Sequence, residues 1–253
     1  MQIFGIDLWR IVVIVVLIFL VVKRADIVAV FAKTKYSMKQ YPQAMKLFKI
    51  ADTIGNLSAN NKMLLGYVCL RCGALEDARK HLNLCKNMVR RDSTDRYQIK
   101  NLLALVSWKE GNLADAIEEL EEIIDSGYQT TQIYQNLGIL YNLSDDKDKA
   151  LKLNLEAYAY NSDDLIICDN LADTYAIRGE YETSAKYYAA LMERNPKPHF
   201  PEAYYGYGKV LIALGKTEEG LSMIKESLEK PFSYLSICSR EEIEELYRSL
   251  GGK

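Results

Sequence analysis

The feature that most constrains the fold of this chain is a spacing of 34 residues between small side chains. Small residues follow successive turn signals at separations of 34, 38, 34, 34 and 36 positions. They are Ala44, Ala78, Ala116, Ala150, Ser184 and Gly220. Self-similarity at a period of about 20 to 50 residues is typical of repeat arrays, in which each unit must stack on its neighbours to bury its apolar side chains. The spacing therefore predicts a solenoid.

Each repeat reads as two helices of about 14 residues joined by a short turn. The turns are marked by Gly73, Gly111, Gly179 and Gly215, with Lys39 and Asp145 in the first and fourth repeats. Glycine at the end of a helix accepts a positive φ at low cost. The predicted units are 25–58, 59–92, 97–130, 131–164, 165–198 and 201–234. A capping helix is expected over 239–250, where Ser239 and Glu242 match a capping box.

The residues inside the repeats match a known pattern. The best unit reads Tyr134-x-x-Leu137-Gly138-x-x-Tyr141 and continues to Ala150 and Ala157. Over 210 of its 253 residues, the chain resembles the tetratricopeptide repeat (TPR) family. The resemblance implies an all-α, right-handed superhelical solenoid of about six hairpins. Asn154 departs from the pattern, because a large apolar residue is usual at its position.

Residues 11–22 form an unbroken apolar run, IVVIVVLIFLVV. Twelve helical residues span about 18 Å, which is less than the roughly 30 Å of a hydrocarbon core. A transmembrane helix would therefore use residues 3–22, with Asp7 and Arg10 able to pair on one helix face. A cleaved signal peptide and a buried core helix are the alternatives, and the first lacks a basic start and a cleavage site. We expect residues 1–24 to form an anchor with a basic flank.

The charges beside this run predict its orientation. The cations Lys23, Arg24, Lys33, Lys35 and Lys39 follow it, against Asp26 alone. By the positive-inside rule, the rest of the chain faces the cytoplasm. An odd number of cysteines, 5 in all, also suits a reducing compartment. The expected location is the cell membrane, single-pass, with a cytoplasmic TPR domain of residues 25–250.

Residues capable of chemistry are sparse. Cys69 and Cys72 form a CxxC motif, but no second pair completes a zinc site and no βαβ pattern surrounds it. The two histidines, His81 and His199, are far apart in sequence. No phosphate-binding loop or nucleophile elbow is present. We therefore predict no catalytic, cofactor-binding or metal-binding residues and no enzymatic activity. A net charge of -2 gives no reason to expect nucleic-acid binding.

The TPR resemblance also implies a binding surface, because the first helix of each hairpin lines a concave groove in that family. The residues it implies here are Met63, Tyr67, Asn101, Trp108, Gln135, Asn136, Asp169, Asn170, Asp173 and Tyr205. Asn136 and Asn170 stand at the position whose amide commonly holds the ligand backbone. The surface suits a peptide or a helix of a partner protein.

The sequence thus predicts a membrane-anchored scaffold or adaptor for protein-protein interaction. A structural subunit of a membrane complex and an organellar import or docking receptor are the alternatives. Self-association through the apolar groove would produce a homo-oligomer. The partners, the pathway and the organism are not specified by the residues.

Overall fold

The computed structural model describes every residue except 1, 4, 5 and 253. The chain divides into two compact units, Met1–Ile99 and Lys100–Lys253, and the boundary falls within one helix. Residues 1, 4 and 5 of the expected anchor lie outside the described residues. The described part is helical apart from one short ladder, as the prediction of an all-α fold requires.

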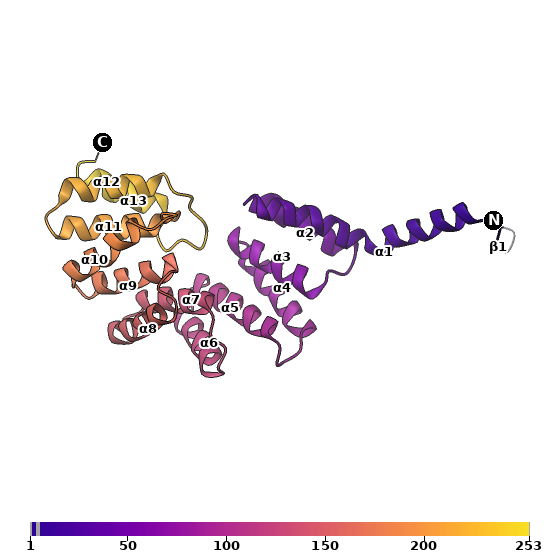
Figure 1. Cartoon of the computed structure of the whole chain (residues 1–253), viewed down its shortest axis with the longest axis horizontal. Helices are drawn as coiled ribbons and strands as arrows, with labels where there is room; N and C mark the ends of the chain where they lie inside the picture. The colour runs from indigo at the N-terminus through magenta and orange to yellow at the C-terminus, as the bar shows by residue number, and fades with distance from the viewer. Residues whose placement is uncertain (1, 4–5, 253) are drawn as a thin grey trace. The chain divides into compact units, whose positions relative to one another are not determined.

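The helices form consecutive pairs (Figure 1). The first unit contains α1 (Leu8–Ser37), α2 (Tyr41–Ile54), α3 (Ala59–Arg71) and α4 (Leu75–Met88), and α5 (Thr94–Lys109) leads into the second. The second continues with α6 (Leu113–Asp125), α7 (Thr131–Asn142), α8 (Lys147–Tyr160), α9 (Leu165–Ile177), α10 (Tyr181–Met192), α11 (Pro201–Ala213), α12 (Thr217–Leu228) and α13 (Arg240–Ser249). Positive φ angles at Gly73, Gly111, Gly179, Gly215 and Lys39 close five of the hairpin turns.

The helix expected over residues 3–22 begins later in the structure. Strands β1 (Gln2–Ile3) and β2 (Ile6–Asp7) pair antiparallel, with Gln2 opposite Asp7 and Ile3 opposite Ile6. Their backbone groups bond across this ladder, so they are not available to a helix, and α1 starts at Leu8. Among the described residues, no helix is long and apolar enough to cross a membrane.

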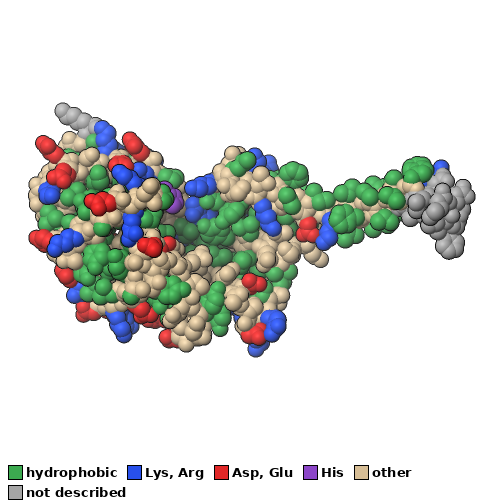
Figure 2. Space-filling view, viewed as in Figure 1, with side chains coloured by type: hydrophobic (Ala, Val, Ile, Leu, Met, Phe, Trp, Pro, Cys, Tyr) green, Lys and Arg blue, Asp and Glu red, His purple; other side chains and the backbone are tan. Residues whose placement is uncertain are grey.

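The first half of α1 nevertheless carries an apolar surface that nothing in the described chain covers. Eleven consecutive side chains, from Val12 to Val22, are 44–71% exposed. Figure 2 shows this stretch as a continuous green surface. The second half of the helix differs, because Ala25, Ala29 and Ala32 are buried in the pairing of α1 with α2. One continuous helix therefore has a packed half and an exposed apolar half.

Close backbone approach holds the two helices of a hairpin together. In the sixth hairpin, a Cβ built on Gly208 would lie 2.8 Å from the carbonyl oxygen of Gly220 and 2.6 Å from the Ile224 side chain. A Cβ on Gly220 would meet the carbonyl oxygen of Gly208 at 2.7 Å. The two glycines therefore let α11 and α12 touch through their main chains, and large side chains fill the flanking space.

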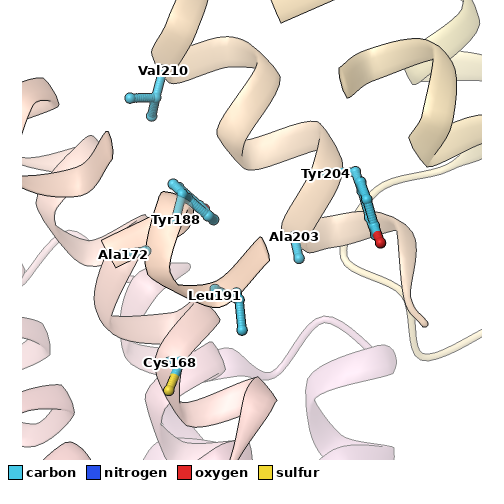
Figure 3. Packing of buried hydrophobic residues seen from close by; sticks show 7 residues of the cluster. All are labelled: Cys168, Ala172, Tyr188, Leu191, Ala203, Tyr204 and Val210. Atoms are coloured by element: carbon cyan, nitrogen blue, oxygen red, sulfur yellow. The ribbon is translucent and has the colours of Figure 1, made fainter. Parts of the chain in front are cut away.

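Buried aromatic and aliphatic residues fill the space between successive hairpins. Figure 3 shows one such cluster, in which Tyr188 from α10 lies between residues of α9 and α11. Its other members are Cys168, Ala172, Leu191, Ala203, Tyr204 and Val210. The small residues Ala172 and Ala203 allow the close approach, and the large ones supply apolar area. No hairpin could bury these faces alone.

The junction between the fourth and fifth hairpins contains a buried polar cluster. The fully buried amide of Asn154 on α8 donates to the hydroxyl of Thr174 on α9 at 2.9 Å and to the side-chain oxygen of Asn142 on α7 at 3.1 Å. The Thr174 hydroxyl lies 2.7 Å from the same Asn142 oxygen. These bonds explain why a polar residue replaces the apolar one usual at position 154. The side-chain oxygen of Asn154 faces the space that a Cβ on Gly138 would fill.

The last helix, α13, is capped as the sequence predicts. The Ser239 hydroxyl accepts a hydrogen bond from the Glu242 main-chain N–H at 3.1 Å, and the Glu242 carboxylate accepts one from the Ser239 N–H at 2.7 Å. Ile243 is fully buried against the array. The helix begins at Arg240 and covers α12.

The contact between Gly208 and Gly220 can be tested by adding one methyl group. At an open helix position, Gly→Ala stabilises by about 0.5–1 kcal/mol. We expect Gly208→Ala to destabilise instead, by about 1–3 kcal/mol, because the new Cβ overlaps backbone that cannot move away. Urea unfolding followed by circular dichroism measures the change. Ser222→Ala, on the exposed side of α12, serves as the control and should leave stability within about 0.5 kcal/mol. A stabilising Gly208→Ala would contradict the close approach.

Candidate functional site

Within residues 100–253, helices α5, α7, α9 and α11 lie on the inner side of a curved row (Figure 1). Their partners α6, α8, α10 and α12 lie on the outer side. We call the surface formed by the four first helices the inner face. Eight of the ten residues predicted to bind a partner stand on these helices. The other two, Met63 and Tyr67, belong to α3 in the first unit.

The predicted asparagines are engaged within the chain. The Asn136 side-chain amide on α7 donates to the Asn101 oxygen on α5 at 2.8 Å. The Asn170 amide on α9 donates to the main-chain oxygen of Gln135 at 2.9 Å, and Asn101 and Asn170 are both buried. The Gln135 amide donates in turn to Asp164 at 2.8 Å. These amides join successive first helices, so each has a structural task in addition to any contact with a ligand.

Acidic side chains gather where α9 faces α11. Asp169 is only 7% exposed, and its Oδ1 has no hydrogen-bond partner among the described residues. Burial, followed by the charges of Asp173 and Glu202, raises the pKa of Asp169 well above its ordinary value, while Lys209 acts in the opposite direction. Burial also raises the pKa of Asp173, although Lys209 and the Asn142 amide favour its charged form. An unpaired buried carboxylate is unfavourable for folding and favourable for binding a cation.

Aromatic and cationic groups occupy the two ends of the inner face. The Lys109 ammonium on α5 lies 3.9 Å from the ring centroid of Trp108. On α11, the Lys209 ammonium lies 4.5 Å from the ring centroid of Tyr205. Trp108 and Tyr205 are half-buried and stand among the predicted residues. Each is thus paired with a lysine from its own helix in a cation–π contact.

In the first unit, Tyr67 belongs to an aromatic cluster. Its ring centroid lies 6.1 Å from that of Tyr36 on α1, and Tyr36 lies 5.9 Å from Tyr41 on α2. The Arg71 guanidinium lies 4.6 Å from the Tyr41 ring centroid. Met63, on the same helix, is half-buried. The structure thus places Tyr67 in a cluster with Tyr36, Tyr41 and Arg71, which the sequence did not identify as binding residues.

Lys109, Glu202 and Lys209 are site residues that the sequence reading missed. Each lies on a first helix, at a position that the family resemblance does not mark as ligand-binding. The weak signal for Lys109 and Lys209 was an aromatic residue close by on the same helix, at Trp108 and Tyr205. No repeat pattern pointed to Glu202, because its role depends on a contact with the segment that follows α12.

The cysteines show no arrangement suited to chemistry. All five thiols are free, and burial raises the pKa of Cys69 to about 12. In the described part of the chain, no three His, Cys, Asp or Glu side chains group as metal ligands would. A cavity of about 260 Å³ lies between α6, α7 and α8, lined by residues that include Tyr141, Lys149 and Glu156. None of the predicted binding residues lines it.

The buried carboxylate of Asp169 predicts a pH-dependent effect of its replacement. A raised folded-state pKa means that this group destabilises the fold as pH rises above its unfolded pKa of about 3.9. We expect Asp169→Asn to stabilise the protein at pH 8 by about 1–3 kcal/mol, the usual cost of an unpaired buried group. At pH 4 the gain should be smaller, because the wild-type carboxyl group is then mostly protonated in the folded state and about half protonated in the unfolded state. Urea unfolding at both pH values measures the difference, and an equal effect at both would contradict the raised pKa.

Three comparisons relate this chain to known proteins. The family model described as "Tetratricopeptide repeat" matches residues 101–164 and 170–230. The chain is 27% identical over 195 residues to the TPR repeat-containing protein YvcD of Bacillus subtilis (strain 168). That alignment covers 77% of this chain and only 37% of the relative.

Solved structures share the fold. A tetratricopeptide repeat protein from Parabacteroides merdae superposes with a TM-score of 0.73 at 13% identity, covering 91% of this chain and 85% of its own. A thermophilic TPR protein of Thermus thermophilus, TTC0263, superposes with a TM-score of 0.61 at 16% identity, covering 76% and 98%. The family model thus matches residues 101–164 and 170–230, and the superpositions show that the chain has the fold of tetratricopeptide repeat proteins.

Proposed function

We propose that this protein is a scaffold for protein-protein interaction, and that the inner face of residues 100–253 binds a peptide or helical segment of a partner. One observation carries the proposal. Groups from α5, α9 and α11 gather on one face, and they include the half-buried ring of Trp108, the unpaired carboxylate of Asp169 and the half-buried ring of Tyr205. Aromatic anchors beside desolvated charges are typical of surfaces that bind proteins.

The inner face also offers structural support for its binding groups. The amides of Asn136 and Asn170 tie the first helices together, so the surface is organised before a partner arrives. A preorganised surface loses less conformational entropy on binding than a mobile one. Residues on helices are also held more accurately than residues on loops.

We further propose that the exposed apolar half of α1 attaches the protein to the cell membrane, with the repeats on the cytoplasmic side. An uncovered apolar surface of this size marks a contact with a membrane or another protein. The run of Val12–Val22 is flanked by Arg10 on one side and by Lys23 and Arg24 on the other. The second flank carries more positive charge, which favours its retention in the cytoplasm.

The inner-face proposal is tested by crosslinking in cells and affinity capture of the full-length protein. One sample carries Trp108→Ala with Asp173→Ala, two residues that are not fully buried. The matched control carries Lys152→Ala with Leu155→Ala on the exposed side of α8. We expect partner recovery to fall at least 10-fold in the first sample, because hot-spot truncation costs about 1.4 kcal/mol or more. Equal recovery from both variants would place binding elsewhere on the molecule.

The membrane proposal is tested by extraction of cell membranes with alkaline carbonate. Each Asp near the middle of a membrane helix costs about 2.5–3.5 kcal/mol. We therefore expect Val15→Asp with Ile18→Asp to move most of the protein to the soluble fraction. Val30→Asp, also exposed on α1 but beyond the apolar run, is the control and should leave the distribution unchanged.

The orientation of the chain needs a separate measurement. A membrane-impermeant maleimide should not label a cysteine introduced at the exposed Ser222 of α12 in intact cells, and should label it once the cells are lysed. Labelling of this cysteine in intact cells would reject the cytoplasmic placement of the repeats, even if the protein stays with the membrane.

A further inference from the structure

A segment that follows the last helix of the sixth hairpin lies on the inner face of residues 100–253. Residues 231–238, which we call the strap, make up most of the connection between α12 and α13. The Lys109 ammonium on α5 donates to the main-chain oxygen of Ser236 at 3.0 Å. The main-chain N–H of Ile237 donates to the Glu202 carboxylate on α11 at 3.3 Å. The strap therefore contacts the first and the last of the four helices that form this face.

In these two contacts, neighbouring main-chain groups of the strap are bonded to side chains of opposite charge. The Lys109 ammonium donates to the carbonyl oxygen of Ser236, and the Glu202 carboxylate accepts from the N–H of Ile237. The Lys109 ammonium also lies 5.6 Å from the ring centroid of Tyr234 in the strap, in addition to its contact with Trp108. Contacts to the main chain do not depend on side-chain identity. Another non-helical segment with an aromatic residue two positions before the carbonyl would make the same three contacts.

The strap is attached to the fold without being part of its core. It contains a turn in which the Ser236 N–H donates to the Ser233 carbonyl at 3.0 Å. Tyr234 and Ile237 are 42% and 39% exposed, Phe232, Leu235 and Cys238 are half-buried, and no side chain of the strap is fully buried. A segment with few buried apolar side chains opens at low free-energy cost compared with the packed helices. The strap can thus leave the inner face while the hairpins stay folded.

The strap offers no hydrogen-bond partner to Oδ1 of Asp169 on the inner face. Its half-buried Cys238 lies near enough to Glu202, Lys209 and Asp169 for their charges to act on the thiol. A thiol supplies no positive charge, and Oδ1 of Asp169 has no hydrogen-bond partner among the described residues. A Lys or Arg side chain at the place of Cys238 would add a second cation to that of Lys209, whose charge already favours the ionised form of Asp169. A charge-assisted hydrogen bond to a desolvated carboxylate is among the stronger polar contacts.

We propose that the strap is an internal ligand of the inner face, and that the partner is a non-helical segment that displaces it, with an aromatic residue placed like Tyr234 and a basic residue placed like Cys238. This inference rests on the proposed function, because it names the class of partner that the same surface takes. The basic residue gives the partner a contact that the strap lacks. The partner needs such an advantage, since a tethered segment competes at an effective concentration of about millimolar.

The test uses fluorescein-labelled synthetic peptides that span residues 229–239. One peptide carries Cys238→Ser and the other Cys238→Arg. Their binding is followed by fluorescence polarisation to the full chain and to a variant whose strap is replaced by eight alternating Gly and Ser residues. We expect saturable binding to the strap-replaced variant and at least 10-fold weaker binding to the unaltered chain. We expect the Arg peptide to bind about 10-fold more tightly than the Ser peptide.

Substitutions on the inner face show which of its residues bind each peptide. In the strap-replaced background, Asp169→Asn should remove the advantage of the Arg peptide, and Lys109→Met should weaken both peptides. Lys152→Ala, on the outer side, should change neither. Absence of binding to the strap-replaced variant, or equal binding with and without the strap, would overturn the proposal. An Arg advantage that survives Asp169→Asn would overturn its basic-residue part.

A second measurement does not depend on replacing the strap. N-ethylmaleimide labelling of the unaltered chain, read by mass spectrometry, reports how often Cys238 is uncovered. Lys109→Met should raise the labelling rate of Cys238 several-fold and leave the fully buried Cys69 unchanged. An unchanged Cys238 rate would show that Lys109 does not hold the strap. The peptides could bind although no cellular partner is captured. That result would reject the proposed function, while the strap would still be an internal ligand of the inner face.

Discussion

The structure depends on the inability of a single helical hairpin to bury its own apolar faces. Each hairpin offers one surface to the hairpin before it and another to the hairpin after it, and small residues set how closely the surfaces meet. Gly208 and Gly220 bring two helix backbones into contact, and Tyr188 fills the space between two hairpins. The positions of the inner-face residues follow from this stacking, because the first helices can project side chains to one side only when the array is packed.

The repeats could be predicted from the sequence because their signals are local and recur. The turn glycines and the small residues at the hairpin contacts stand at a period that a single chain displays without any relatives. The start of α1 could not be predicted, because pairing of residues 2–3 with residues 6–7 competes with helix formation and leaves no periodic pattern. The assignment of binding roles to Asn101 and Asn170 relied on resemblance alone, and periodicity does not reveal whether an amide faces a ligand or a neighbouring helix.

The inner face uses polar groups in two opposite ways. The amides of Asn136 and Asn170 are satisfied by neighbouring helices, so they add order to the array. The carboxylate of Asp169 is buried without such a partner among the described residues, which opposes folding. The contacts of the strap could not be predicted from the sequence. The strap follows the last helix of the sixth hairpin, and its contacts join residues as distant in sequence as Lys109 and Ser236.

The polar junction of Asn142, Asn154 and Thr174 restricts how this array can evolve. At the positions one repeat away from Asn154, the chain has the buried apolar residues Leu120 and Tyr188. Residues Leu140 and Val210 likewise stand where Thr174 stands in the fifth hairpin. Duplication, loss or exchange of either hairpin at this junction would leave a buried amide facing hydrocarbon, at a cost of about 1–3 kcal/mol. We therefore expect the fourth and fifth hairpins to change together, because the Asn154 amide of one needs the Thr174 hydroxyl of the other.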